Sequence, residues 1–105
     1  MANFLFVYHG GKKPESPEES QKVMQQWKAW LEGLGGAVVD PGNPVGMSKT
    51  VYADRVADDG GANPVSGYSI ISADTIEDAI AKGKDCPHVG HGGSIEIAEI
   101  YEIDL

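Results

Sequence analysis

The segment from Asn3 to His9 restricts the possible folds of this chain most, because it is a strand with two apolar faces. Alternate side chains of a strand point to opposite sides. Here they form two rows, Phe4, Phe6, Tyr8 and Leu5, Val7, His9. A strand whose faces are both apolar is covered on both sides. The sequence therefore predicts a sheet with a packed layer on each face.

Two helices are expected, and each has a recognisable start. Ser16 and Pro17 suit the beginning of the first helix, and Glu19 is placed as in a capping box. An apolar stripe then recurs at helical spacing, and it consists of Val23, Met24, Trp27, Trp30, Leu31 and Leu34. Asp74 and Glu77 frame a second capping box, whose helix ends at 86–87 because a proline follows Cys86.

Three further strands are expected at 37–39, 66–72 and 94–103. Between the first two, a broken continuation of strand is expected at 45–52 and a hairpin-like loop at 53–64. Residues 88–93 form a loop. The order β-α-β-β-α-β is that of the ferredoxin-like α+β fold, a four-stranded antiparallel sheet with two helices on one face. Residues 1–105 form a single domain, in which strands one and three are central and strand four lies beside strand one.

The last strand also carries apolar residues on both faces. One row is Ile95, Ile97, Tyr101 and Ile103, and the other is Ala98 and Ile100. Two helices cover only one face of a four-stranded sheet, so a second subunit is needed for the other face. The sequence predicts a homodimer.

Charge and apolar content exclude several kinds of partner. The chain has 8 Lys and Arg against 16 Asp and Glu, a net charge of -8, and all of the excess lies in residues 54–105. This balance argues against nucleic acid and favours uncharged or apolar ligands. Because no segment approaches the ~20 apolar residues of a membrane span, and the start lacks a basic signal region, no membrane partner and a cytoplasmic location are expected. The single Cys86 is read as a structural thiol.

Several segments together resemble the YCII-related family. They are residues 66–71, the helix start at 74–79, the pair Cys86-Pro87, and residues 92–97. The resemblance implies a ferredoxin-like subunit that dimerises face to face as a dimeric α+β barrel, with a pocket between sheet and helix. Members are mostly of unassigned function, and some are linked to chemistry resembling that of muconolactone isomerases and dehydrochlorinases. The His on the first helix that some members pair with an Asp is absent from this sequence.

The three histidines are the candidate proton-transfer groups, because imidazole is the side chain that titrates near neutrality. His9 ends the first strand, while His88 and His91 precede the fourth, so the expected topology brings all three to one rim of the sheet. We expect a catalytic cluster of His9, His88, His91 and Tyr8 there. Three imidazoles also suit a metal ion, but pocket-rim histidines are the commoner case, and we assign no metal and no cofactor.

Tyr68, Met47, Trp30 and Glu99 are the candidate substrate-binding residues. The aromatic and thioether side chains suit a pocket for a small apolar or aromatic molecule, although Trp30 equally suits the core. Glu99 shares a face with apolar neighbours if the strand is regular, whereas a bulge would turn it to solvent. Two functional classes stay open. One is a cofactor-independent isomerase or lyase that uses pocket His and Tyr, and the other is a non-catalytic ligand-binding or accessory dimer.

Overall fold

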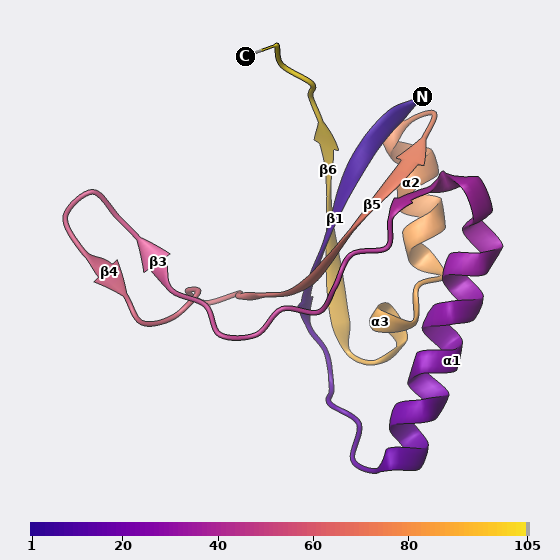
Figure 1. The fold of residues 1–105 in the computed structure, drawn as a ribbon, viewed down its shortest axis with the longest axis horizontal. Helices are drawn as coiled ribbons and strands as arrows, with labels where there is room; N and C mark the ends of the chain where they lie inside the picture. The colour runs from indigo at the N-terminus through magenta and orange to yellow at the C-terminus, as the bar shows by residue number, and fades with distance from the viewer. Residues whose placement is uncertain (105) are drawn as a thin grey trace.

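A four-stranded sheet forms the centre of the computed structural model, which describes residues 1–104 (Figure 1). Its strands are β1 (Ala2–Gly10), β2 (Val38–Asp40), β5 (Val65–Ala73) and β6 (Gly93–Ile100). Their order is β2-β5-β1-β6, and every neighbouring pair is antiparallel. The predicted antiparallel sheet of an α+β chain is confirmed, with β1 and β5 central and β6 beside β1.

The helices lie against one face of this sheet (Figure 1). They are α1 (Pro17–Leu34), α2 (Ile76–Lys84) and the short α3 (Pro87–Gly90), and a 3-10 turn (Gly35–Ala37) follows α1. A loop was expected at 88–93, and α3 corrects this. Pro87 occupies the first helical position, where its missing N–H costs nothing, and one helical turn follows. Among residues 1–104, no helix is long and apolar enough to cross a membrane.

The start of α1 agrees with the sequence, while the start of α2 is one residue later than expected. The Glu19 N–H donates to the Ser16 hydroxyl at 3.1 Å. In α2 the cap is Thr75, whose hydroxyl accepts from the Asp78 N–H at 3.1 Å. The Asp78 carboxylate in turn accepts from the Asp74 N–H at 3.2 Å. The expected box at Asp74 and Glu77 is therefore wrong, because Thr75 has the extended backbone that a cap requires.

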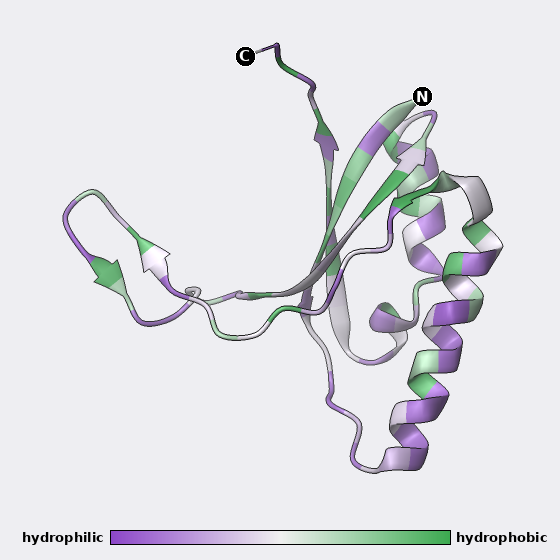
Figure 2. Ribbon diagram, in the orientation of Figure 1, coloured by the Kyte–Doolittle hydropathy of each residue, from purple (hydrophilic) through white to green (hydrophobic). Residues whose placement is uncertain are grey.

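The core lies between the sheet and the helices, and Figure 2 shows the apolar strands that face it. Its buried apolar residues are Phe4, Phe6, Tyr8, Trp30, Ile71, Ala73, Ala79 and Cys86. The indole N–H of Trp30 donates to the Lys82 carbonyl at 3.0 Å, which ties α1 to α2. The apolar row of the first strand that begins with Phe4 thus packs under the helices, as the alternation predicts.

Residues 46–62, which we call the arm, project from the body (Figure 1). The arm contains β3 (Thr50–Val51) and β4 (Val56–Ala57), which pair with each other only. The strand continuation expected at 45–52 is wrong, because contact with the sheet ends at a bridge between Pro44 and Gly67. The projection gives a radius of gyration of 15.1 Å, against about 13 Å for a compact chain of this length.

The face of the sheet opposite the helices, which we call the open face, has no covering layer among the described residues. It carries the half-buried side chains Leu5, Val7, Tyr68, Ile70 and Ile100. The expected strand to residue 103 is too long, because β6 ends at Ile100. Tyr101 and Ile103 lie beyond its last partner, Asn3, and are exposed.

Candidate functional site

A cavity of about 610 Å³ lies between α1 and the ends of β1 and β5. One wall is the apolar face of α1, with Val23, Met24, Trp27 and Leu31. The other walls are the loop at 10–14, the segment at 41–45, and side chains that include Tyr8, His88 and His91. Its volume is that of sites that hold small organic molecules.

Tyr8 forms the floor of the cavity with its ring, while its hydroxyl is engaged elsewhere. The hydroxyl donates to Ser69 Oγ at 2.8 Å, and Ser69 donates to the Pro41 carbonyl at 2.7 Å. Burial raises the pKa of Tyr8, so the phenol stays protonated. The ring meets Trp27 edge to face, with centroids 5.1 Å apart. Tyr8 therefore offers an ordered aromatic surface, and its O–H is already engaged in the hydrogen bond to Ser69.

His88 is held in one orientation beside this floor. Its Nε2 lies 2.8 Å from the His9 carbonyl, which can only accept, so Nε2 carries the hydrogen. In the neutral ring Nδ1 then holds the lone pair. Gly11 and Gly93 make room for the ring, because a Cβ at Gly93 would lie 2.1 Å from Nε2 and one at Gly11 would lie 2.7 Å from Cε1. The His88 ring centroid is 5.4 Å from that of Tyr8.

His91 joins three segments at the mouth of the cavity. Its Nε2 lies 3.1 Å from the Gln26 side-chain oxygen on α1. Its backbone carbonyl accepts from the Lys12 N–H at 2.9 Å, which fixes the loop between β1 and α1. The turn before β6 therefore positions the loop that carries Lys12 and Lys13, both of which line the cavity.

The side chain of His9 lies on the open face, away from the cavity. Nε2 is 3.0 Å from the Glu96 carboxylate and Nδ1 is 3.2 Å from the Pro64 carbonyl. Both partners are acceptors, so the protonated ring satisfies both bonds. The hydrogen bond to Glu96 raises the pKa of His9, although burial opposes it. Ser66 is an extra residue in β5 opposite the step from Tyr8 to His9.

The predicted histidine cluster is therefore split. The three residues do share one rim, and His88 touches the backbone of His9. However, the alternation of β1 sends the side chains of Tyr8 and His9 to opposite faces. Of the trio, His88 and His91 line the cavity.

The remaining candidates are dispersed. Tyr68 lies at the edge of the cavity, but it alternates with Ser69, so its side chain belongs to the open face. Trp30 is a core residue, and Met47 is 93% exposed on the arm. Glu99 lies opposite Phe4 in the regular register of β6, so no bulge turns it away. Its side chain is nevertheless exposed to solvent, as the second of the two alternatives expected.

Sequence reasoning missed Trp27 and the two lysines as site residues. Trp27 belongs to the same helical stripe as Trp30. Only the position of α1 in the fold shows that Trp27 lines the cavity and that Trp30 lies in the core. Lys12 and Lys13 directly follow the pair Gly10-Gly11 at the end of the first strand, and this was the only feature of the sequence that could have pointed to them. A loop held over a cavity by His91 depends on contacts between distant segments, which periodicity does not show.

The remaining reactive groups are the Cys86 thiol and the side chains that could bind a metal ion. Burial raises the pKa of the Cys86 thiol to about 11, so it is protonated near neutrality. Within residues 1–104, no group of three or more His, Cys, Asp or Glu side chains is arranged to hold a metal ion. Cys86 is a free cysteine that is buried in the core.

A scan against models of known protein families finds no match, and a search of curated proteins finds no relative of this chain.

Proposed function

We propose that this chain is a ferredoxin-like, YCII-related domain that binds a small apolar or aromatic molecule in the cavity beside α1. The observation that carries the proposal is a cavity of about 610 Å³ with an ordered aromatic floor. The strand order and the placement of the helices on one face support the ferredoxin-like arrangement. Residues 66–71 and 92–97 support the family.

The walls suit a flat apolar ligand. Tyr8 and Trp27 already meet edge to face, an arrangement that a third ring can extend. Met24 adds a flexible thioether that adapts to ligands of different shape. We therefore place binding first, and the surface that a ligand would meet is mostly apolar.

A homodimer is the functional unit in this proposal. The uncovered open face supports it, and so does the arm, whose Val51 and Val56 are 78% and 60% exposed. One chain thus carries two apolar surfaces that it does not cover itself. A symmetric pair of chains buries both, since each copy offers the same surfaces to the other.

Filling the cavity tests the binding proposal. Val23→Trp places an indole in the cavity, whereas Gln25→Trp places one on an exposed, non-lining position of the same helix. A panel of aromatic acids, lactones and aromatic amides is screened by thermal shift and isothermal titration. We expect saturable stabilisation of the wild type and of Gln25→Trp, and none of Val23→Trp. Equal binding to all three proteins contradicts the proposal.

Proton transfer by His88 is the second candidate function. The hydrogen bond from Nε2 to the His9 carbonyl favours it, because this bond fixes the tautomer and leaves Nδ1 as the base. If His88 transfers protons, an acidic C–H of a bound ketone or lactone should exchange with deuterium from D₂O. NMR measures the rate of this exchange. His88→Gln should abolish the exchange. If exchange at the wild type equals the buffer rate for every ligand that binds, the non-catalytic class holds.

A further inference from the structure

We propose that the cavity selects anions, namely small molecules with an apolar or aromatic body and one carboxylate. The inference rests on the proposed binding function and names the ligand class of that same site. It rests on the charge of the lining, the position of the charged groups, and the shape of the apolar wall.

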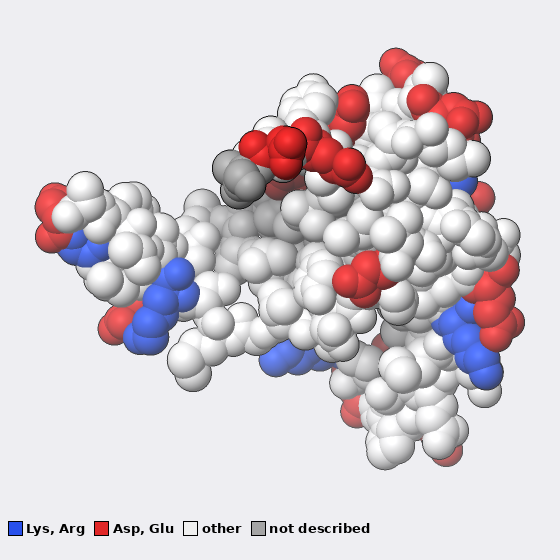
Figure 3. Space-filling view, turned by 45° about the horizontal axis from the view of Figure 1, so that its top comes forward, with Lys and Arg blue, Asp and Glu red and all other residues white. Residues whose placement is uncertain are grey.

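The lining has the opposite charge balance to the rest of the chain. Acidic residues outnumber basic ones by 16 to 8 in the sequence. Among residues 1–104, however, the lining contains Lys12, Lys13, His88 and His91 and not one Asp or Glu. Figure 3 shows acidic side chains spread over the visible surface, with the largest areas along its upper half. The cavity is thus a local exception in an acidic protein.

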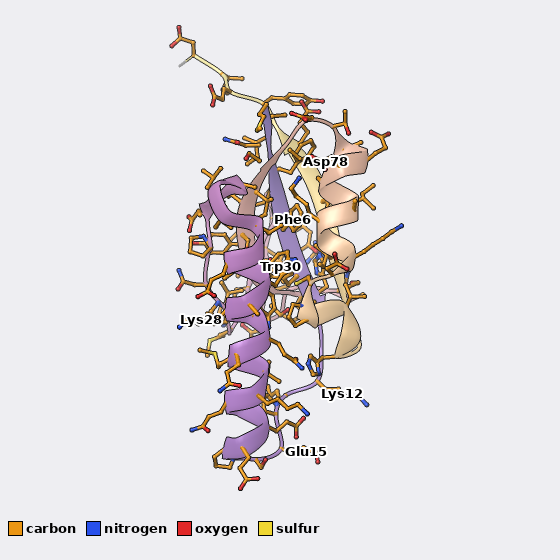
Figure 4. All side chains as sticks on the ribbon, turned by 90° about the vertical axis from the view of Figure 1, so that its right-hand side faces the viewer. Phe6, Lys12, Glu15, Lys28, Trp30 and Asp78 are labelled. Atoms are coloured by element: carbon orange, nitrogen blue, oxygen red, sulfur yellow. The ribbon has the colours of Figure 1, made fainter. Side chains whose placement is uncertain are left out.

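No ion pair among residues 1–104 neutralises the two lysines. Neither Lys12 nor Lys13 forms an ion pair within the described residues. Both lie on the loop that leaves β1, where Figure 4 labels Lys12, and the bond from the Lys12 N–H to the His91 carbonyl holds that loop in place. Both lysines are exposed and line the cavity, so a carboxylate that enters here approaches an anchored segment that carries two positive charges.

The apolar and basic parts of the lining come from different segments. Val23, Met24 and Trp27 extend along α1, and the lysines lie on the loop before it. A ligand with a ring against Trp27 and a carboxylate toward the loop satisfies both. A cationic ligand would gain from the aromatic faces, but it would meet two like charges and no carboxylate.

From the net charge of -8, the sequence predicts uncharged or apolar ligands. The basic lining of the cavity favours anionic ligands instead. Charges farther away than about 8 to 10 Å are screened at physiological salt. The lining itself, with two lysines and no carboxylate among residues 1–104, is therefore the part of the charge distribution closest to a bound group.

Matched pairs of ligands test the inference, with phenylacetate and 3-phenylpropionate each compared with its neutral amide by isothermal titration. We expect each acid to bind the wild type up to roughly tenfold more tightly than its amide, the gain from two exposed charge contacts. In Lys12→Gln/Lys13→Gln this preference should fall to about onefold, with affinity for the amides retained. Lys28→Gln is the control, because Lys28 lies on α1 outside the lining.

The outcomes separate this inference from the function on which it rests. If acids and amides bind the wild type equally, or the amides bind more tightly, the anion preference is wrong and the binding function stands. If the double variant keeps the preference, the assignment to the lysines is wrong. If neither member of either pair binds, selection of these aromatic carboxylates is contradicted, and the wider panel with Val23→Trp then decides the binding function separately.

Discussion

His9 links three segments through its two ring nitrogens, since β1 carries the ring, β6 carries Glu96, and Pro64 lies where the chain returns from the arm. Because the folded-state pKa of His9 is raised, its stabilisation is complete below the unfolded-state value of 6.5 and is lost as pH rises through the folded value. Glu96→Gln should therefore lower the melting temperature more at about pH 5.5 than at about pH 9.

Glu99→Gln is the matched control, because Glu99 is exposed on the same strand and forms no ion pair within residues 1–104. Its effect should be small at both pH values. Thermal unfolding followed by circular dichroism measures all three proteins. An effect of Glu96→Gln that does not change with pH would mean that His9 is not the titrating partner.

The packing of His88 against Gly93 gives a second prediction at the residue scale. In Gly93→Ala the new Cβ would overlap Nε2, so the ring must move and its bond to the His9 carbonyl is lost. We expect a destabilisation of about 1 to 3 kcal/mol, the usual cost of forcing extra atoms into a packed site. Urea unfolding measures it.

Gly90→Ala is the comparison, since a Cβ at Gly90 meets no atom within 4 Å. It should leave the free energy of unfolding nearly unchanged. Equal losses in the two variants would show that a general effect of removing glycine, rather than the displacement of His88, is responsible.

At the scale of elements, the start of α2 is a test of the capping geometry. Thr75→Ala removes the hydroxyl that accepts from the Asp78 N–H and should cost about 1 kcal/mol. Asp74→Ala keeps the backbone N–H that donates to Asp78, so its cost should be smaller. Urea denaturation compares the two, and a larger loss in Asp74→Ala would restore the cap at Asp74.

The regular elements were predictable because their signals are local. The stripe of α1 and the cap at Ser16 lie within one helix, and the alternation of β1 lies within one strand. The cap of α2 was misplaced because Asp74 and Thr75 are both good capping residues, and only the backbone distinguishes them. A hairpin-like loop was expected at 53–64, but the earlier departure from the sheet after Pro44 was missed, because it depends on contacts with Gly67.

The site was predictable only in part. Tyr8, His88 and His91 have the residue types that chemistry needs, and they line the cavity. The side on which His9 lies followed from the period of β1, which separates it from Tyr8. The pairing of His88 with Gly11 and Gly93 joins residues far apart in the sequence, so no local pattern indicates it.

At the scale of the whole molecule, the homodimer is the first prediction. Light scattering after gel filtration at micromolar concentration should give the mass of two chains. Ile70→Lys puts a charge on the open face and should shift the protein to one chain, while Val89→Lys, on exposed α3, should not. A wild type with the mass of one chain contradicts the dimer, and circular dichroism verifies that each variant is folded.

The central claim is that a ligand occupies the cavity between α1 and the sheet, and the two tryptophans report on it directly. Trp27 lines the cavity, whereas Trp30 is in the core with its indole N–H bonded to the Lys82 carbonyl. Indole N–H resonances, assigned with Trp27→Phe, are followed by NMR while phenylacetate or its amide is added. The account predicts that the Trp27 resonance shifts saturably and that of Trp30 stays nearly constant. A Trp27 resonance that stays fixed while other residues shift would contradict it.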